Sequence, residues 1–394
     1  MVKAGVGINQ NLSDHKKAAS DAGVEALGKL GGSQPNIVFA FSSIQYNQED
    51  VLAGLKSVFP SALIVGGSAA GEITSWVTNF DSVNVMAVAS DQISFATGIG
   101  ANVQADSSKA GAMAVEDLIK NKGGQKPNLL ILIVDGMAAN GSAVVEGARS
   151  VLGADAPMIG GSAGDDYLFK KTYEYYNDKV VTDTVVAVGF YGDFSYGFGI
   201  RHGWTPVGLP VKVTKANGVW IQELDGQPAL KLYEDYFGKE ASELVKEPLA
   251  RMAYTYPIGI AVEGSDELLI RDPVIANEKG EISMAAAIPE GATVRLMIGD
   301  KDKAIDAAKW AAEMARGQLE GRNPAFILMF NCMARNKLLG LRCHEENQTV
   351  QKAIGAEVPM LGFYTYGEIG PLLGKKNTPA YFHNETMTLL VVGE

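Results

Sequence analysis

The sequence predicts an α/β protein in which helices cover mixed β-sheets. Three observations support this prediction: short apolar runs typical of buried strands, Ala-rich stretches with helical spacing, and the recurrence of both in one order three times along the chain. The chain has 394 residues, of which 47% are hydrophobic and 20% are charged. This composition is that of a well-packed globular protein, and the length suggests about two or three domains.

Each recurrence begins with a short glycine-containing segment, passes through a predicted helix and reaches a predicted buried strand. The opening segments are Gly5-Val6-Gly7-Ile8, Gly98-Ile99-Gly100 and Leu296-Met297-Ile298-Gly299. Apolar residues spaced three and four apart predict helices at 16–30, 110–119 and 304–315. Short apolar runs that follow a proline predict strands at 37–41, 129–134 and 326–330.

The second half of each recurrence is a further helix, a buried strand, a glycine-rich turn and a closing strand. The predicted helices are 49–59, 141–152 and 345–354, and the closing strands are 83–88, 184–190 and 386–392. The turns are Gly66-Gly67-Ser68-Ala69-Ala70-Gly71-Glu72, Gly160-Gly161-Ser162-Ala163-Gly164-Asp165 and Gly362-Phe363-Tyr364-Thr365-Tyr366-Gly367-Glu368. We therefore expect three diverged strand–helix–strand–turn–strand repeats that arose by duplication.

A different segment, residues 201–289, separates the second repeat from the third. Its alternating stretch around Asn217-Gly218 predicts a β-hairpin, and glycine turns join further short strands. We expect two domains: residues 1–200 with two repeats, and residues 201–394 with this β-rich insert and the third repeat.

Composition excludes several classes of protein. The 34 Lys and Arg residues against 45 Asp and Glu give a net charge of −11, so we expect no nucleic-acid partner. Two cysteines cannot form a disulfide framework, which favours a reducing compartment. The N-terminus shows no secretory signal, and the longest apolar run is far shorter than the roughly 20 residues that span a bilayer. We expect a cytoplasmic protein without a membrane partner.

The glycine turns raise the question of enzymatic activity. Gly160-Gly161-Ser162-Ala163-Gly164 matches the nucleophile elbow G-x-S-x-G, but the following residues are β-like where that motif requires a helix. The feature common to the three turns is glycine, which permits positive φ and close backbone approach. We expect a protein that is not an enzyme. The carboxylates after the turns, Glu72, Asp165 and Glu368, are expected to act as caps or turn residues.

The cysteines and histidines give few metal-binding patterns. Cys332 and the pair Cys343-His344 fit neither zinc spacing nor the c-type haem motif, so lining of a core or pocket is expected. His15 lies on the polar start of a helix, and His383 precedes the final strand. His202 lies with Arg201 and Trp204 where the repeat pair meets the insert, and such junctions often form ligand pockets. It is either a structural histidine or an axial ligand of a haem iron, with Arg201 beside a propionate.

Several of these motifs together resemble the FIST sensory domain, in both its N-terminal and C-terminal parts. They are the three glycine turns, Glu223-Leu224-Asp225-Gly226-Gln227-Pro228-Ala229-Leu230, and Phe330-Asn331-Cys332-Met333-Ala334-Arg335. FIST domains are ligand-sensing modules of bacteria and archaea. The chain resembles a stand-alone subgroup that binds haem, senses nitric oxide and regulates a partner histidine kinase in two-component signalling and biofilm control.

The resemblance implies a haem-based nitric-oxide sensor with haem b as its cofactor. From position and chemistry we expect His202 to hold the iron, Arg201 and Trp204 to line the cofactor site, and His383 or His344 to be the alternative ligands. A second hypothesis is a binding module for an amino-acid-like metabolite, whose carboxylate the glycine-turn N–H groups would bind. A weaker one is a hydrolase that uses Ser162. A homodimer is left open.

Overall fold

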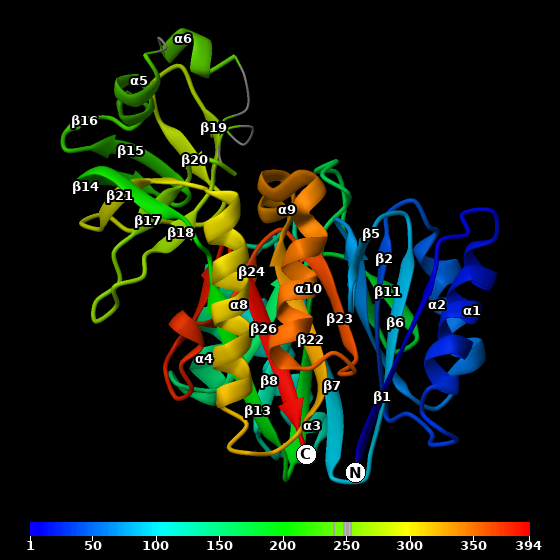
Figure 1. Ribbon diagram of the computed structural model, residues 1–394. Coiled ribbons are helices and arrows are strands. Elements are labelled where there is room, and N and C mark those ends of the chain that lie inside the picture. Colours follow the sequence, from blue (N-terminus) through cyan, green and yellow to red (C-terminus); the bar gives the residue numbers. More distant parts are fainter. Residues whose placement is uncertain (239–240, 247–248, 250–251, 253) are drawn as a thin grey trace.

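The computed structural model describes residues 1–238, 241–246, 249, 252 and 254–394, which form a body of three six-stranded sheets and an insert with a sheet of its own (Figure 1). The α/β class with mixed sheets is confirmed. In the described part of the chain, no helix combines the length and the apolar character needed to cross a membrane.

The three body sheets share one strand order. The first sheet runs β1 (Val2–Asn9), β6 (Val83–Ser90), β2 (Ile37–Ser43), β3 (Leu63–Ala69), β10 (Glu174–Tyr176) and β11 (Lys179–Val181). The second runs β7 (Ile93–Ala101), β12 (Thr184–Gly192), β8 (Leu129–Val134), β9 (Met158–Ser162), β24 (Glu368–Pro371) and β25 (Ala380–His383). The third runs β13 (Ser195–Arg201), β26 (Met387–Gly393), β22 (Pro324–Cys332), β23 (Met360–Thr365), β4 (Glu72–Thr74) and β5 (Val77–Asn79).

The last two strands of each sheet come from a different segment of the chain than its first four. Hairpin β4–β5 leaves the first segment and joins the third sheet, β10–β11 leaves the second and joins the first sheet, and β24–β25 leaves the third and joins the second sheet. The central pairs β2–β3, β8–β9 and β22–β23 are parallel, and the other neighbours are antiparallel. The predicted strands 37–41, 129–134 and 326–330 therefore occupy one equivalent position, while their common ancestry stays a prediction.

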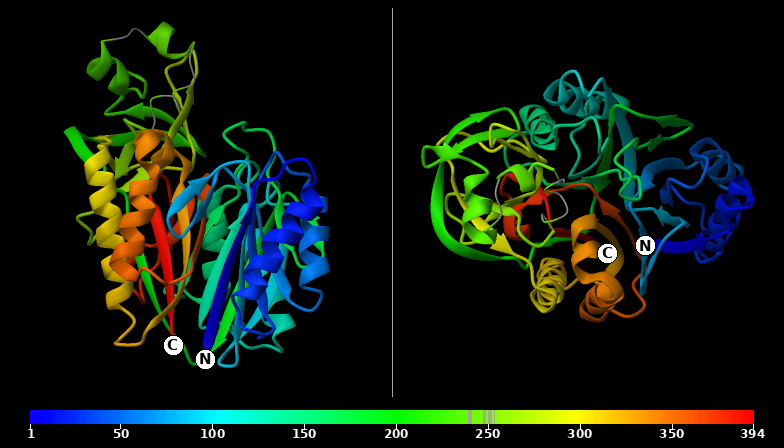
Figure 2. Two further views of the ribbon diagram at one scale, coloured as in Figure 1. Left: turned by 45° about the vertical axis from the view of Figure 1, so that its right-hand side comes forward. Right: turned by 90° about the horizontal axis from the view of Figure 1, so that it is seen from above.

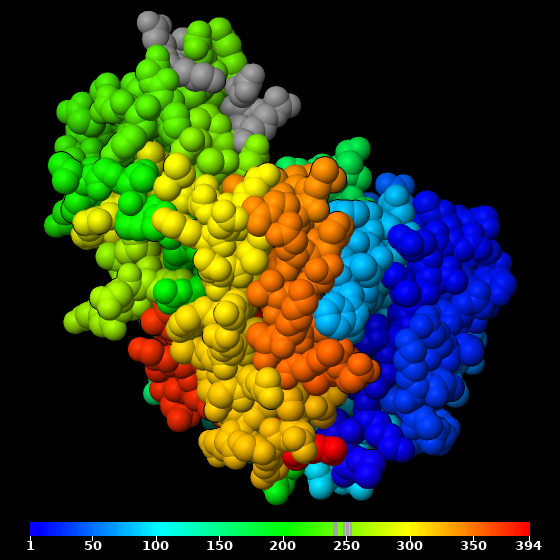
Figure 3. Space-filling view, viewed as in Figure 1, coloured from blue at the N-terminus to red at the C-terminus, as the bar shows by residue number. Residues whose placement is uncertain are grey.

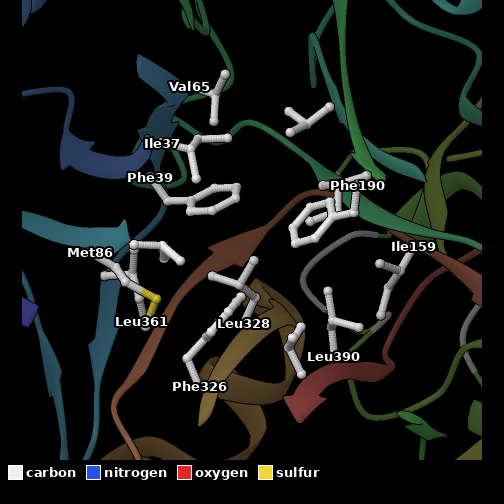
Figure 4. Close-up of a cluster of buried hydrophobic side chains, with 14 of the residues drawn as sticks. Ile37, Phe39, Val65, Met86, Ile159, Phe190, Phe326, Leu328, Leu361 and Leu390 are labelled. Atoms are coloured by element: carbon white, nitrogen blue, oxygen red, sulfur yellow. The ribbon is translucent and has the colours of Figure 1, made fainter. Parts of the chain in front are cut away.

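Helices cover the outer face of each body sheet, and seen from above they form three pairs around the strands (Figure 2). The pairs are α1 (His15–Gly28) with α2 (Gln48–Val58), α3 (Ser107–Asn121) with α4 (Gly141–Leu152), and α8 (Lys301–Gly317) with α10 (Cys343–Ile354). The short α9 (Met333–Leu339) and turn η1 (Gly340–Arg342) precede α10, and turn η2 (Leu372–Gly374) follows β24. Apolar side chains fill the space between the sheets, among them Phe39, Phe190 and Phe326 (Figure 4).

The insert separates β13 from α8 and projects from one end of the body (Figure 3). Its sheet runs β18 (Leu269–Arg271), β17 (Ile258–Ile260), β21 (Thr293–Ile298), β14 (Thr205–Asn217), β15 (Trp220–Leu224), β20 (Ile282–Met284) and β19 (Pro273–Ala276), with β16 (Gln227–Pro228) beside β15. Helices α5 (Lys231–Phe237) and α6 (Ala241–Leu244) complete it. The hairpin around Asn217-Gly218 is confirmed, because Asn217 pairs with Trp220.

One predicted element is wrong. Leu296-Met297-Ile298-Gly299 does not open the third unit, because residues 293–298 form β21 in the insert sheet. The opening strand is β13, whose Gly197 and Gly199 lie where an added Cβ would be 1.9 Å from the carbonyl oxygens of Ala315 and Ala311 in α8. Gly5 and Gly7 face α1, and Gly98 and Gly100 face α3, in the same way. The glycine pair lets each Ala-rich helix approach its strand closely, and the predicted domain boundary at residue 200 falls inside β13.

Candidate functional site

Three fully buried glutamates mark equivalent positions at one end of the body. Glu72, Glu174 and Glu368 each begin a hairpin that crosses to a neighbouring sheet. Glu72 accepts a hydrogen bond from the Ser82 hydroxyl at 2.7 Å, Glu174 from the Thr184 hydroxyl at 3.0 Å and Glu368 from the Thr386 N–H at 3.1 Å. Burial raises the pKa of all three carboxyls well above the ordinary value, because it disfavours their ionised forms.

The expected equivalence of Asp165 with Glu72 and Glu368 is wrong, because Glu174 occupies that position. Asp165 instead organises the loop that follows the second glycine turn. Its carboxylate accepts hydrogen bonds from the backbone N–H groups of Phe169, Lys170 and Lys171 and from the Tyr366 hydroxyl. A turn role is therefore confirmed for Asp165, and it fixes the loop against the third glycine turn.

The glycine turns bind one another and leave few backbone donors for a ligand. Ser162 N–H donates to the Gly367 carbonyl at 2.8 Å, Gly164 N–H to Ser68 at 3.0 Å and Ala70 N–H to Tyr364 at 3.0 Å. These three N–H groups are occupied by the neighbouring turns and are not free to bind a carboxylate. Ser162 is buried, and no histidine in the described residues hydrogen-bonds to it.

A pocket of about 90 Å³, here called the interface pocket, lies where the insert meets the body. The body contributes Cys332, Thr365 and Tyr366 from two of the FIST-like motifs, and the insert contributes Tyr254 and Asp272. Aromatic rings form one wall: the Tyr167 and Phe169 centroids are 4.7 Å apart, and those of Phe169 and Tyr366 are 5.0 Å apart. Domain junctions of this kind are common ligand sites.

Two carboxyl groups without a basic partner lie at this pocket. Asp272 lines it, and Glu385, which is fully buried, is close enough to share a proton with Asp272. Both Glu385 oxygens and Asp272 Oδ1 lack a hydrogen-bond donor in the described chain, and neither residue forms an ion pair there. Burial raises the pKa of Asp272 to about 6, and burial together with the nearby Asp272 raises the pKa of Glu385.

The arginine whose charge acts on Glu385 is already occupied by other groups. Arg335, the last residue of the Phe330–Arg335 motif, is fully buried and forms an ion pair with Glu346. Its guanidinium also donates to the carbonyls of Ala304 and His202. These contacts tie α9 to α8, to α10 and to the residue that follows β13, so the Arg335 side chain is engaged away from the Asp272 carboxyl.

Cys332 lines the interface pocket as a protonated thiol. Burial, followed by the charges of Glu368, Glu385 and Asp272, raises its pKa well above the ordinary value, which disfavours the nucleophilic thiolate. Cys343 is buried as well, with its sulfur 3.7 Å from His344 Nδ1. In the part of the chain that the structure describes, no three His, Cys, Asp or Glu residues are arranged to hold a metal ion.

Arg201, His202 and Trp204 come together at a different pocket, of about 370 Å³, between the insert and α8. The backbone N–H of Trp204 donates to His202 Nδ1 at 2.9 Å, and His202 Nε2 lies 3.2 Å from Glu267 Oε1 but has no hydrogen-bond partner in the described chain. Since Nδ1 accepts a hydrogen bond, the neutral ring carries its proton on Nε2, facing Glu267. Burial, followed by the charge of Arg201, lowers the pKa of His202 to about 3.

These contacts do not fit a haem bound through His202. An axial ligand needs a nitrogen lone pair directed at the iron, whereas the only lone pair of this ring accepts the Trp204 N–H. Arg201, expected beside a propionate, is paired with Glu267 and lies 4.4 Å over the Trp310 ring. His383 is buried with Nε2 2.9 Å from the Gly370 carbonyl, and His344 is exposed on α10.

Asp272 and Glu385 were not predicted from the sequence. Glu385 had a detectable signal: Asp81-Ser82, Asp183-Thr184 and Glu385-Thr386 form one acid–hydroxyl pattern before the three closing strands, and all three acids have φ between 52° and 58°. Asp81 is exposed and Asp183 half-buried, whereas Glu385 lies fully buried next to the insert. Asp272 directly follows the three-residue strand β18, and no sequence pattern pointed to it.

Mycobacterial proteins are similar to this chain along nearly its whole length. Uncharacterised proteins of Mycobacterium tuberculosis H37Rv and Mycobacterium bovis are 28% and 26% identical, and each alignment covers 95% of this chain and 96% or 95% of the relative. A cyanuric acid hydrolase from A. caulinodans matches at 10% identity over 100% of this chain and 99% of its own, with a TM-score of 0.33. Structural likeness at that level assigns neither fold nor function.

Two domains of one protein family together match most of the chain. The FIST N domain matches residues 36–227 and the FIST C domain matches residues 229–371. The interface pocket is formed by both matched regions, since Tyr167 and Phe169 belong to the first and Cys332 and Tyr366 to the second. The chain belongs to the FIST family of sensory domains.

Proposed function

We propose that this protein is a sensor of a small cationic amine, bound in the interface pocket. The observation that carries the proposal is the Asp272–Glu385 carboxyl pair: Asp272 lines the pocket, Glu385 lies buried beside Asp272, and neither forms an ion pair in the described chain. Two carboxyls that share a proton are poised to exchange it for a ligand ammonium group, which donates hydrogen bonds to both.

The aromatic wall supports the same class of ligand. Cations are attracted to the faces of aromatic rings, most strongly where water is excluded. Lys337 already lies with its ammonium 4.9 Å from the Tyr167 ring centre, so this wall contacts one cation in the described structure. Of the functions that the sequence leaves open, the metabolite-binding module is therefore favoured, with an amine in place of the expected carboxylate as the group bound.

A ligand here would connect the insert to the body, because the lining residues Asp272 and Tyr254 come from the insert and Thr365 and Tyr366 from the body. Clamping the two parts together is a direct way to convert binding into a change of shape. Haem b, nitric oxide, a histidine-kinase partner and cytoplasmic location rest on the resemblance and on composition. A haem absorption band that disappears in His202→Ala would favour the haem sensor instead.

Calorimetric titration with n-butylammonium and with its uncharged analogue n-butanol tests the proposal. We expect the cation to bind at least tenfold more tightly than the alcohol, and Asp272→Asn to remove this preference, because one charge-assisted hydrogen bond is worth roughly 1.5–3 kcal/mol. Glu278→Gln, an exposed acid on the same insert, is the matched control and should bind like the wild type. Equal affinity for cation and alcohol, or an unchanged preference in Asp272→Asn, would contradict the proposal.

A further inference from the structure

A third cavity, of about 660 Å³, lies between α4 and the insert sheet. Much of its wall is apolar, including Val145 from α4, Ile260, Leu269 and Ile288 from the insert, and Phe382 from β25. We call it the Arg271 cavity, after the arginine that lines it. It shares no lining residue with the interface pocket.

Arg271 is a buried cation without a carboxylate partner. Its side chain is 4% exposed, and its guanidinium donates to the carbonyls of Ile270 and Phe382 at 2.9 and 2.8 Å and to the Ser142 hydroxyl at 3.3 Å. The Nε–H has no acceptor in the described chain, and no ion pair there includes Arg271. Burial lowers the pKa of Arg271 to about 10, although the charge of Asp272 opposes this shift.

The remaining charged groups of the cavity are at its exposed side. Glu146, Glu263 and Glu290 are exposed, Arg149 is half-buried, and the Glu290 carboxylate accepts the Ala216 N–H at 2.9 Å. The buried charge of the cavity is therefore positive, and the surface around it is mixed. A buried cation is costly unless it is paired, so a ligand that brings a negative charge to Arg271 removes a cost that the protein alone does not offset.

We infer that the Arg271 cavity binds a small anion with an apolar body, its carboxylate or equivalent acid group on the Arg271 guanidinium and its hydrocarbon part against Val145, Leu269 and Ile288. The inference is independent of the amine proposed for the interface pocket. Arg271 and Asp272 are consecutive residues, and side chains of consecutive extended residues point to opposite faces. The amine and the anion are therefore bound by different charged residues, Asp272 and Arg271, which are adjacent in the sequence.

Octanoate and octanol, which share a hydrocarbon chain and differ in charge, are the probes. Calorimetry on the full chain should show octanoate binding at least tenfold more tightly than octanol. Arg271→Met should reduce octanoate affinity to that of the alcohol, while Arg271→Lys, which keeps the charge, should retain part of the preference. Arg295→Met, a half-buried arginine of the same insert sheet that lines neither cavity, is the matched control and should bind like the wild type.

The wild-type comparison keeps the inference testable if Arg271→Met does not fold. Equal affinity of the wild type for octanoate and octanol would overturn the inference, as would no binding of octanoate at millimolar concentration. A folded Arg271→Met protein with unchanged octanoate affinity would overturn it as well. None of these outcomes bears on n-butylammonium, so failure here is distinguishable from failure of the proposed function.

Discussion

Glu385 differs in side-chain length and in burial from the residues at the equivalent positions of the other two units. Its counterparts Asp81 and Asp183 share its left-handed backbone but have shorter side chains and reach solvent. Asp183 also accepts the Gln104 N–H at 2.7 Å, which satisfies part of its carboxylate. Glu385 has one more methylene group and lies next to the insert, where it meets Asp272 instead of water. Burying two carboxyl groups side by side reduces the free energy of unfolding, and a structural role alone does not explain this arrangement.

The raised pKa of Asp272 predicts that the stability of the protein depends on pH. The pKa of Asp272 is about 6 in the folded protein, above the ordinary value of 3.8. A raised pKa contributes stability that is fully present below the unfolded value and is lost as pH rises through the folded value. We therefore expect Asp272→Asn, which is neutral throughout, to gain on the order of 2 kcal/mol relative to the wild type between pH 4 and pH 7.5.

Urea unfolding of both proteins at the two pH values measures this difference. Glu278→Gln, on the exposed loop of the same insert, should follow the wild type at both. A gap between Asp272→Asn and the wild type that is constant with pH would mean that Asp272 ionises normally in the folded protein, without a shared proton.

Strand β13 and helix α8 show how glycine placement governs the contact between two elements. Gly199 faces α8 so closely that an added Cβ would lie 1.9 Å from the Ala311 carbonyl oxygen. The helix presents a face of buried alanines at this contact, among them Ala308 and Ala312. Neither element can shift independently, because β13 pairs with β26 and α8 covers the same sheet.

We expect Gly199→Ala to destabilise the protein by about 1–3 kcal/mol through overpacking. Gly317→Ala, in the last turn of α8, is the matched control, since an added Cβ there meets no atom within 4 Å. That substitution should be neutral or stabilising by up to about 1 kcal/mol, because alanine has the higher helix propensity. Equal effects of the two substitutions on the melting temperature would show that the glycine contact is not tight.

Across the molecule, local sequence patterns predict elements but not their partners. The apolar runs of β2, β8 and β22 and the spacing of α1, α3 and α8 are local, so strands and helices were found. The whole sheet of the insert lies between β13 and α8 in the sequence, and no local pattern connects those two elements. The exchange of hairpins among the sheets depends equally on long-range pairing.

The site was harder to predict than the fold for the same reason. His202, Arg201 and Trp204 are neighbours in sequence, and they do share a pocket, but the structure alone reveals that the Trp204 backbone N–H donates to the imidazole and that Glu267 pairs with Arg201. Asp272 and Glu385 are distant in sequence and meet only because the insert docks on the body. A site formed by two elements that are distant in the sequence cannot be predicted from a local motif.

Proton release on amine binding tests the central proposal most directly. If an ammonium group replaces the proton that Asp272 and Glu385 share, calorimetric titration of n-butylammonium at neutral pH, repeated in buffers of different ionisation enthalpy, will report about one proton released per ligand bound. The same titration of Asp272→Asn will report almost none. Binding of the amine to the wild type without proton release would contradict the account, because the carboxyl pair would then not be where the ligand binds.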